Sequence, residues 1–234
     1  MRRRDHDDPG PGGVSTVIDL DQHGDVWVLT MRNGENRFDL ESIAALHAAL
    51  DRVEQVETPV ALVTTGEGKF YSNGLDLDWL LSAGPEAAGF IDDVHRLLGR
   101  VLGFAGVTVA AVNGHAFAGG AMLTAAHDAV VMRDDRGYWC LPEVDLGLPL
   151  SPAMYAVVAA HISEPTLRVA LHSGRRYSAA DALAAGIVHE VATESAVVER
   201  AIARASEVAS KNRDVIRAHK RLMYADALRL CGVE

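Results

Sequence analysis

Apolar and polar positions along the chain predict a domain in which strands and helices alternate. Apolar runs of strand length occupy 14–20, 26–31, 60–64, 107–112, 129–132, 138–141 and 187–191. Helical spacing predicts helices over 40–56, 85–104, 119–126, 152–161, 165–172, 178–184, 194–210 and 214–230. A turn over 21–25 makes the first two strands a hairpin, and the later alternation favours an α/β fold with parallel strand pairing.

The same pattern divides the 234 residues into three regions. Residues 1–13 are polar and rich in turn formers, which predicts a disordered lead and is unlike a signal peptide or membrane anchor. Residues 14–190 form the predicted α/β core, and 191–234 form a C-terminal helical region. No apolar run approaches the roughly 20 residues of a transmembrane helix, so no membrane partner is expected.

Charge and cysteine content narrow the possible partners and the compartment. The formal charge of −10 argues against a nucleic-acid partner, because phosphate backbones need clustered Lys and Arg. Cys140 and Cys231 match no disulfide or metal spacing, which suits a reducing, cytoplasmic setting. The ten histidines form no H-E-x-x-H motif, so no metal site is predicted.

The most informative stretch runs from 109 to 123. An apolar strand ends at Asn113-Gly114, and a second apolar segment begins at Ala118-Gly119-Gly120. A strand, a glycine turn and a helix start expose backbone N–H groups that can hold an anion or a developing oxyanion. On this stretch alone, a turn whose glycines only allow close packing is an equally good interpretation.

Two further features survive comparison with known chemical motifs. Tyr71-Ser-Asn-Gly-Leu-Asp76 is a second small-residue turn after a strand, so two turns can each aim one N–H at a single oxygen. Glu143 follows another strand between Pro142 and Val144, where apolar surroundings would make its carboxylate a better base. A solvated loop residue is the plainer interpretation of Glu143 by itself. Phosphate-loop, dinucleotide and G-x-S-x-G motifs are incomplete or missing.

In this order, these pieces resemble the crotonase (enoyl-CoA hydratase/isomerase) family over roughly residues 14–230. The resemblance rests on Lys69-Phe-Tyr-Ser-Asn-Gly-Leu-Asp-Leu77, Ala110-Ala-Val-Asn-Gly-His-Ala-Phe-Ala-Gly-Gly120, Leu141-Pro-Glu-Val-Asp-Leu-Gly147 and Tyr177-Ser-Ala-Ala-Asp-Ala-Leu-Ala-Ala-Gly-Ile-Val188. It implies a spiral core of ββα repeats, a C-terminal helical region that builds a homotrimer or a dimer of trimers, and an acyl-CoA thioester substrate from fatty-acid β-oxidation. No cofactor beyond the substrate's own CoA is implied.

The resemblance also assigns roles to residues. It places the oxyanion hole on the backbone N–H groups of Asn73 and Gly119, and the catalytic carboxyl on Glu143. The stretch Ser72, Gly74, Leu75 and Asp76 would lie against CoA, and two basic residues, Arg37 and Lys220, are candidates for its phosphates.

A departure from the family pattern indicates the subclass. Hydratases of the family use two glutamates, and the first of these positions holds Met122, which transfers no protons. A single glutamate suits a Δ3,Δ2-enoyl-CoA isomerase, and the phrases 70–77 and 132–138 are most similar to the monofunctional isomerases. The alternatives are a hydratase or thioester hydrolase that uses Glu143 with water, and a non-catalytic acyl-CoA-binding member of the family. Pocket walls are expected from the 78–104 region and the 146–154 loop.

Overall fold

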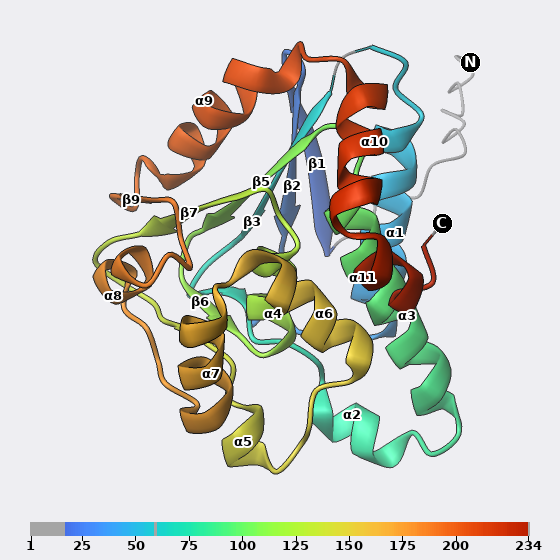
Figure 1. The fold of residues 1–234 in the computed structure, drawn as a ribbon, viewed down its shortest axis with the longest axis vertical. Coiled ribbons are helices and arrows are strands. Elements are labelled where there is room, and N and C mark those ends of the chain that lie inside the picture. The colour runs from blue at the N-terminus through green and yellow to red at the C-terminus, as the bar shows by residue number, and fades with distance from the viewer. Residues whose placement is uncertain (1–16, 59, 234) are drawn as a thin grey trace, which may run out of the picture.

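The fold is built on a large, mostly parallel sheet (Figure 1). The computed structural model describes residues 17–58 and 60–233. The sheet contains, in spatial order, β1 (Ile18–His23), β2 (Val26–Met31), β3 (Ala61–Gly66), β5 (Val107–Val112), β7 (Ala129–Arg133) and β9 (Glu190–Ala192). β1 and β2 form the predicted antiparallel hairpin, and the other neighbours pair in parallel.

Both faces of this sheet are covered by helices, which explains why its inner strands are continuous apolar runs. α1 (Leu40–Glu54) and α3 (Glu86–Leu102) lie on one side, and α9 (Val197–Ala209) crosses the other (Figure 1). α9 presents Val197, Ala201, Ala205 and Ala209 to the strands, and these small residues allow close approach. Asp39 caps α1 as predicted, because its side chain accepts the Ser42 N–H.

A second, smaller parallel sheet has the order β4 (Phe70–Ser72), β6 (His115–Phe117) and β8 (Trp139–Cys140). The chain alternates between the sheets: a strand in the large sheet leads to a strand in the small sheet and then to a helix. β3–β4 leads to α2 (Leu77–Ser82), β5–β6 to α4 (Gly119–Ala125), and β7–β8 to α5 (Glu143–Leu146). This repetition confirms the predicted spiral core of ββα units.

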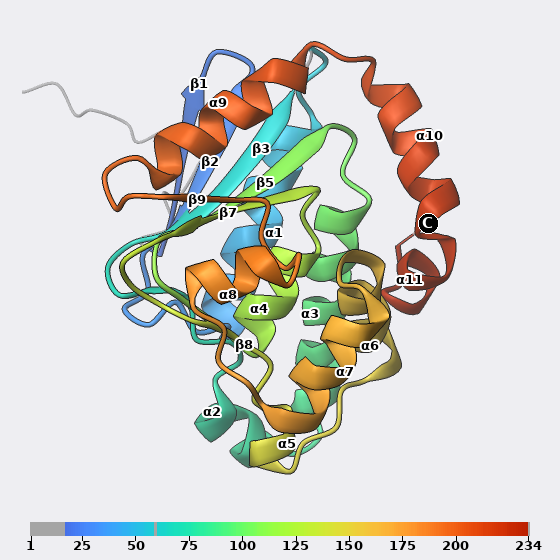
Figure 2. The same ribbon diagram turned by 60° about the vertical axis from the view of Figure 1, so that its left-hand side comes forward.

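Several elements differ from the sequence predictions. β4, α2 and α5 lie outside the predicted strands and helices, and β6 lies in the predicted glycine turn. The last predicted helix is two helices, α10 (Arg213–Met223) and α11 (Ala225–Leu230). They are separated at Tyr224, whose φ of −117° and ψ of 20° are not helical. Both stand at the edge of the molecule (Figure 2), whereas α6 (Pro152–His161), α7 (Glu164–Ser173) and α8 (Ala179–Ala184) match predicted helices.

The division into regions is only partly visible in the structure. The lead over residues 1–13 lies outside the described residues. The predicted boundary after residue 190 falls inside β9, and α9 beyond it belongs to the core of the sheet. Among the described residues, no helix is both long and apolar enough to cross a bilayer.

Candidate active site

The candidate chemical groups meet at one edge of the small sheet. β4 is followed by Asn73-Gly74-Leu75, β6 by Ala118 and Gly119, and β8 by Leu141-Pro142-Glu143. The register pairs Ser72 with Ala116 and Ala116 with Trp139, so the three parallel strands end at nearly the same level. Ligands bind at the carboxyl ends of parallel strands in open α/β sheets, and this edge has that geometry.

The turns after β4 and β6 touch each other through glycine. A Cβ atom added to Gly74 would lie 2.9 Å from the Gly119 nitrogen. A Cβ on Gly120 would lie 2.3 Å from the Ser72 carbonyl oxygen, and one on Gly119 would lie 2.6 Å from Leu75 Cδ1. The packing interpretation of these glycines is therefore correct, and the same packing brings the two turns into contact.

Backbone hydrogen bonds show which N–H groups at this edge are free. The Asn73 N–H donates to the Glu35 carbonyl at 3.0 Å, and the Asp76 N–H donates to the Phe38 carbonyl at 2.9 Å. Between them, the Leu75 N–H has no acceptor in the part of the chain that the structure describes, and neither does the Gly119 N–H. The prediction for Asn73 is therefore wrong in this structure, because its N–H is already occupied, whereas Gly119 remains available.

The pairing of Phe38 with Leu75 explains why the Leu75 N–H lacks an acceptor while the Asp76 N–H has one. The two residues form an isolated parallel bridge, in which the Gly74 carbonyl accepts from Phe38 and the Asp76 N–H donates back. Successive peptide groups of an extended chain point in opposite directions. The Leu75 N–H consequently points away from Phe38, so the available donor lies two residues after Asn73.

Ala118 has an unusual backbone that turns the next peptide group. Its φ of 48° and ψ of −121° lie in a region that residues with a Cβ rarely adopt, at a cost of order 1–3 kcal/mol. Its N–H donates to the Cys140 carbonyl at 3.1 Å, which fastens the turn to β8. The flipped peptide after Ala118 orients the Gly119 N–H at the start of α4, where the helix dipole favours negative charge.

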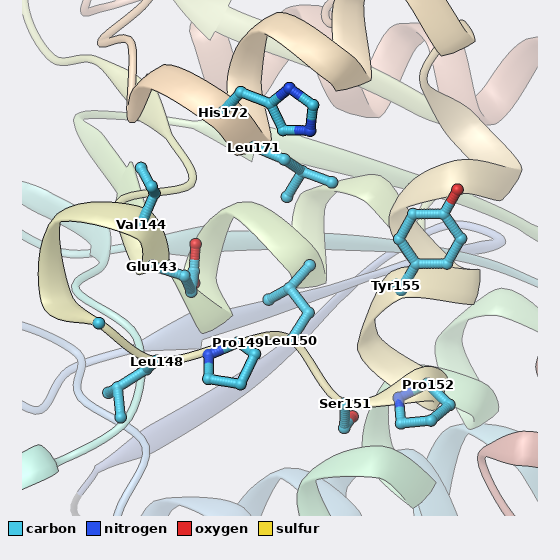
Figure 3. Close-up of a pocket in the computed structure, with 11 residues that line it drawn as sticks. Glu143, Val144, Leu148, Pro149, Leu150, Ser151, Pro152, Tyr155, Leu171 and His172 are labelled. Atoms are coloured by element: carbon cyan, nitrogen blue, oxygen red, sulfur yellow. The ribbon is translucent and has the colours of Figure 1, made fainter.

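Glu143 begins α5 and lines a cavity of about 700 Å³ (Figure 3). Its Oε2 atom is buried and has no hydrogen-bond partner among the described residues. Burial disfavours the charged form and raises the pKa of Glu143 to about 7, against a weaker opposing backbone hydrogen bond. A carboxyl with this pKa can both accept and return a proton near neutral pH.

The rest of the cavity is mainly apolar, with polar groups at a few points. Figure 3 shows Tyr155 of α6 and His172 of α7 on the side of the cavity away from Glu143. Ser151 also lines it, and its hydroxyl is 2.8 Å from His95 Nε2. The apolar wall consists of Val144, Leu148, Pro149, Leu150, Pro152 and Leu171.

These walls were only partly predicted. The loop expected over 146–154 does contribute, whereas no residue of the 78–104 region lines this cavity. The contribution of α7 was missed. Leu171 and His172 carry no sequence signal, because only the packing of α7 beside α5 brings them to the cavity.

The remaining predicted residues lie in different environments. Ser72 is fully buried, and its hydroxyl donates to the Asn36 carbonyl and accepts the Gly74 N–H, so it shapes the turn. Asp76 caps α2. Arg37 pairs with Glu35, which also accepts a hydrogen bond from the Asn73 side chain.

Lys220 cannot bind CoA phosphates as predicted. Its side chain is 6% exposed, and Nζ lies 2.7 Å from Asp128 Oδ2 and 3.0 Å from the Gly106 carbonyl oxygen. Sequence places this lysine on an amphipathic helix, but α10 directs it into the protein, where it contacts the residues directly before β5 and β7.

The turns that follow the three strands of the small sheet hold two backbone N–H groups without acceptors among the described residues and one buried carboxyl oxygen. The family model described as enoyl-CoA hydratase/isomerase matches residues 21–230. Enoyl-CoA delta isomerase 3 of Arabidopsis thaliana is 36% identical over 225 residues, covering 90% of this chain and 93% of the relative. The peroxisomal enoyl-CoA delta isomerase 2 of the same plant is 33% identical, covering 92% and 93%.

Solved structures agree with these sequence comparisons. A protein of Mycobacterium tuberculosis, described as an enoyl-CoA isomerase in one solved structure and as a probable enoyl-CoA hydratase in another, superposes with a TM-score of 0.85 at 28% identity; the former structure covers 94% of this chain and 96% of that one. The chain therefore belongs to the enoyl-CoA hydratase/isomerase family, whose members act on acyl-CoA thioesters.

Proposed function

We propose that the protein is a Δ3,Δ2-enoyl-CoA isomerase, which converts 3-enoyl-CoA into 2-trans-enoyl-CoA. The observation that carries the proposal is Glu143 Oε2, a buried carboxyl oxygen without a partner among the described residues, on the turn next to those of the Leu75 and Gly119 N–H groups, which also have no acceptor there. The relatives named enoyl-CoA delta isomerase support the same reaction class.

The proposed mechanism moves one proton within the substrate. The Glu143 carboxylate removes a proton from C2, the electron pair shifts through the carbonyl carbon, and the thioester oxygen becomes a dienolate oxygen. The Leu75 and Gly119 N–H groups donate to that oxygen and stabilise the charge where it develops. The protonated Glu143 then returns the proton at C4, which leaves the double bond between C2 and C3 and restores the carboxylate.

Met122 supports isomerisation over hydration. It lies in α4 two residues after Gly120, is 2% exposed, and offers no group that transfers a proton. Adding water across a double bond needs a second proton-transfer group beside Glu143. The proposed reaction needs no cofactor other than the CoA of the substrate.

Replacing the carboxyl tests the proposal. Glu143→Gln should lower the rate of conversion of 3-hexenoyl-CoA to 2-hexenoyl-CoA by at least about a hundredfold, because general acid–base catalysis contributes roughly 10²–10⁴-fold. Glu57→Gln, which removes an exposed carboxyl, is the matched control. Wild-type turnover by Glu143→Gln would contradict the proposal, and unchanged circular dichroism would show that the variant is folded.

The pH dependence gives an independent measurement. The free enzyme must hold Glu143 as carboxylate to begin the reaction, and burial raises the pKa of that group to about 7. We expect kcat/KM to rise with pH and to level off above about 7. A flat profile from pH 5.5 to 8.5 would show that another group starts the reaction.

Hydration is the second candidate, because Tyr155 and His172 line the cavity of Glu143 and could act on a water molecule. Crotonyl-CoA hydration, assayed beside isomerisation, separates the two activities. Hydration as fast as isomerisation, and lost in Tyr155→Phe or His172→Ala, would favour the hydratase.

We further propose that the protein assembles as a homotrimer or a dimer of trimers in the cytoplasm. Exposed Val215, Leu222 and Met223 on α10 offer an apolar surface for such contacts. Light scattering on the purified protein measures the assembly directly, and a monomeric mass would contradict it.

A further inference from the structure

Three polar side chains form a hydrogen-bonded series in the interior behind the reacting edge. Tyr71 lies on β4, Thr64 lies on β3, and His127 follows the end of α4. The Tyr71 hydroxyl is 2.7 Å from Thr64 Oγ1, which is 2.9 Å from His127 Nε2. On the other side of the ring, His127 Nδ1 is 2.7 Å from the carbonyl oxygen of Leu123 in α4. We call Tyr71, Thr64 and His127 the polar bridge.

The polar bridge lies in a part of the core that is otherwise apolar. Its three side chains are at most 3% exposed. Thr64 borders a small void whose other walls are aliphatic or methionine side chains, among them Leu46 and Leu97. Buried polar groups are costly unless every one of them is hydrogen-bonded, whereas a satisfied network holds the elements that it joins in one arrangement. The elements joined by the polar bridge therefore indicate its purpose.

Every hydrogen of the polar bridge can be assigned in one direction. His127 Nδ1 faces a carbonyl oxygen, so it carries the hydrogen and donates to Leu123. Burial lowers the pKa of His127 to about 3, so the ring is neutral and its Nε2 accepts the Thr64 hydroxyl. Thr64 Oγ1 in turn accepts the Tyr71 hydroxyl. Removing the Thr64 hydroxyl would consequently leave a buried donor at one end and a buried acceptor at the other.

The polar bridge connects the two elements that carry the available N–H groups. Tyr71 precedes Leu75 by four residues along β4 and its turn, and Leu123 lies about one helical turn after Gly119 in α4. Backbone pairing between β4 and β6 is short, since each strand has three residues, and its register is irregular. The side-chain bonds through Thr64 therefore add a second link between the segments that hold the two donors.

The helix α4 is also tied to the strand that leads to Glu143. Trp139, on β8, is completely buried, and its Nε1–H donates to Thr124 Oγ1 at 2.9 Å. The Thr124 hydroxyl donates to the Ala121 carbonyl at 2.7 Å within α4. Buried side-chain hydrogen bonds thus join α4, which itself begins at Gly119, to the strands that precede the other two turns.

We propose that the polar bridge positions the Leu75 and Gly119 N–H groups at the separation that a single substrate oxygen needs. This inference rests on the proposed function, in which both groups donate to the thioester oxygen, and it makes Tyr71, Thr64 and His127 positioning residues that act through the backbone of β4 and α4. Such donors stabilise developing charge only when they are held at hydrogen-bond distance from the oxygen. A misplacement of about 1 Å can cost roughly a hundredfold in rate. Because the charge develops after the substrate is bound, loosening the polar bridge should lower kcat far more than it raises KM.

Substitutions at two adjacent threonines of β3 test the inference. Thr64→Val removes the central hydroxyl with little change of shape, whereas Thr64→Ser keeps the hydroxyl. Thr65→Val is the matched control, because Thr65 is buried to a similar extent but its hydroxyl donates to the Ala111 carbonyl of β5 at 2.9 Å. With 3-hexenoyl-CoA, we expect kcat to fall at least about tenfold in Thr64→Val while KM changes less than about twofold. Thr64→Ser and Thr65→Val should keep kcat within about twofold of the wild-type value.

The carbonyl stretch of a bound thioester reports the two donors directly. Infrared difference spectra of saturating hexanoyl-CoA, which cannot isomerise and is labelled with a heavy isotope at its carbonyl carbon, measure how strongly the N–H groups polarise the C=O bond. The band should move to lower frequency on binding to the wild type, Thr65→Val or Glu143→Gln, and Thr64→Val should lose at least about half of this shift. No proton transfer is involved. The spectra therefore still decide the inference if Glu143→Gln keeps wild-type turnover and the isomerase mechanism fails.

Stability measurements separate positioning from packing. Urea unfolding should show that Thr64→Val and Thr65→Val are both folded and both less stable than the wild type, because each loses a buried hydrogen bond. If Thr64→Val does not fold, Tyr71→Phe, which removes only the terminal hydroxyl of the polar bridge, replaces it with the same direction of change expected in kcat and in the carbonyl band. A folded variant with wild-type kcat or an unchanged band shift would overturn the inference, because the polar bridge would then only stabilise the core.

Discussion

Burial of the Glu143 carboxyl should lower the stability of the folded protein by a measurable amount at neutral pH. Burial raises its pKa from an ordinary value of 4.5 to about 7. In the unfolded chain the carboxyl is a normal acid, so between these pH values the native state binds more protons than the unfolded state. Stability therefore falls as pH rises through this window. Because the pKa rises from 4.5 to about 7, and each pH unit corresponds to about 1.36 kcal/mol, the stability lost through this titration has an upper limit of roughly 3 kcal/mol.

Glu143→Gln removes the titration but keeps the shape of the side chain. The buried amide has its own cost for unpaired polar atoms, which is independent of pH, so the informative quantity is the difference between variant and wild type at several pH values. We expect the variant to gain about 2–3 kcal/mol relative to wild type between pH 4.5 and pH 8. Urea unfolding at pH 4.5, 6, 7 and 8 measures this difference. A constant difference would refute the argument that burial of the Glu143 carboxyl raises its pKa.

Three further predictions concern the framework of the site. Gly120→Ala should destabilise the fold by at least about 1–3 kcal/mol, since its Cβ would meet a backbone carbonyl at 2.3 Å, whereas Gly89→Ala, in open space on α3, should stabilise it by up to about 1 kcal/mol; thermal unfolding compares the pair. Burial lowers the pKa of His127 from 6.5 to about 3. The neutral ring therefore makes its full contribution to the free energy of unfolding above pH 6.5, and this contribution is lost as pH falls toward 3. The acid-unfolding midpoint should therefore move to lower pH in His127→Gln, and an unmoved midpoint would contradict this. Lys220→Met should cost about 1.5–3 kcal/mol in urea unfolding, because Asp128 loses its cation but is 26% exposed and keeps the Thr108 N–H and hydroxyl as donors, yet it should leave KM for acyl-CoA unchanged; a higher KM would return Lys220 to the CoA site.

The turn after β4 shows which features follow from local sequence and which depend on tertiary pairing. Both Asn73 and Leu75 lie in the same small-residue turn, and each has a backbone N–H. The segment 35–38, which packs against this turn, decides which of the two N–H groups is already hydrogen-bonded. The Glu35 carbonyl accepts from the Asn73 N–H, whereas the bridge with Phe38 leaves the Leu75 N–H facing the other way. No pattern within the turn itself contains that information.

The short strands β4 and β6 of the small sheet could not be predicted from the sequence, because they also depend on tertiary pairing. β4 and β6 are three residues long, too short for an alternating pattern to stand out, and they exist because they pair with each other and with β8. The long elements were predictable, since strands buried on both faces must be continuously apolar and helices on a sheet must have an apolar stripe.

The sequence by itself determined the α/β class, most helices and the family, and it indicated Glu143 and Gly119 as candidate chemical groups, because these depend on local composition and on motifs contiguous in the chain. The tertiary structure decided what depends on distant segments meeting. It selected Leu75 as the second free donor, buried Lys220 against Asp128, and brought His172 to the cavity of Glu143. The direction of a peptide group or side chain is set by the partner that packs against it, and that partner is remote in sequence.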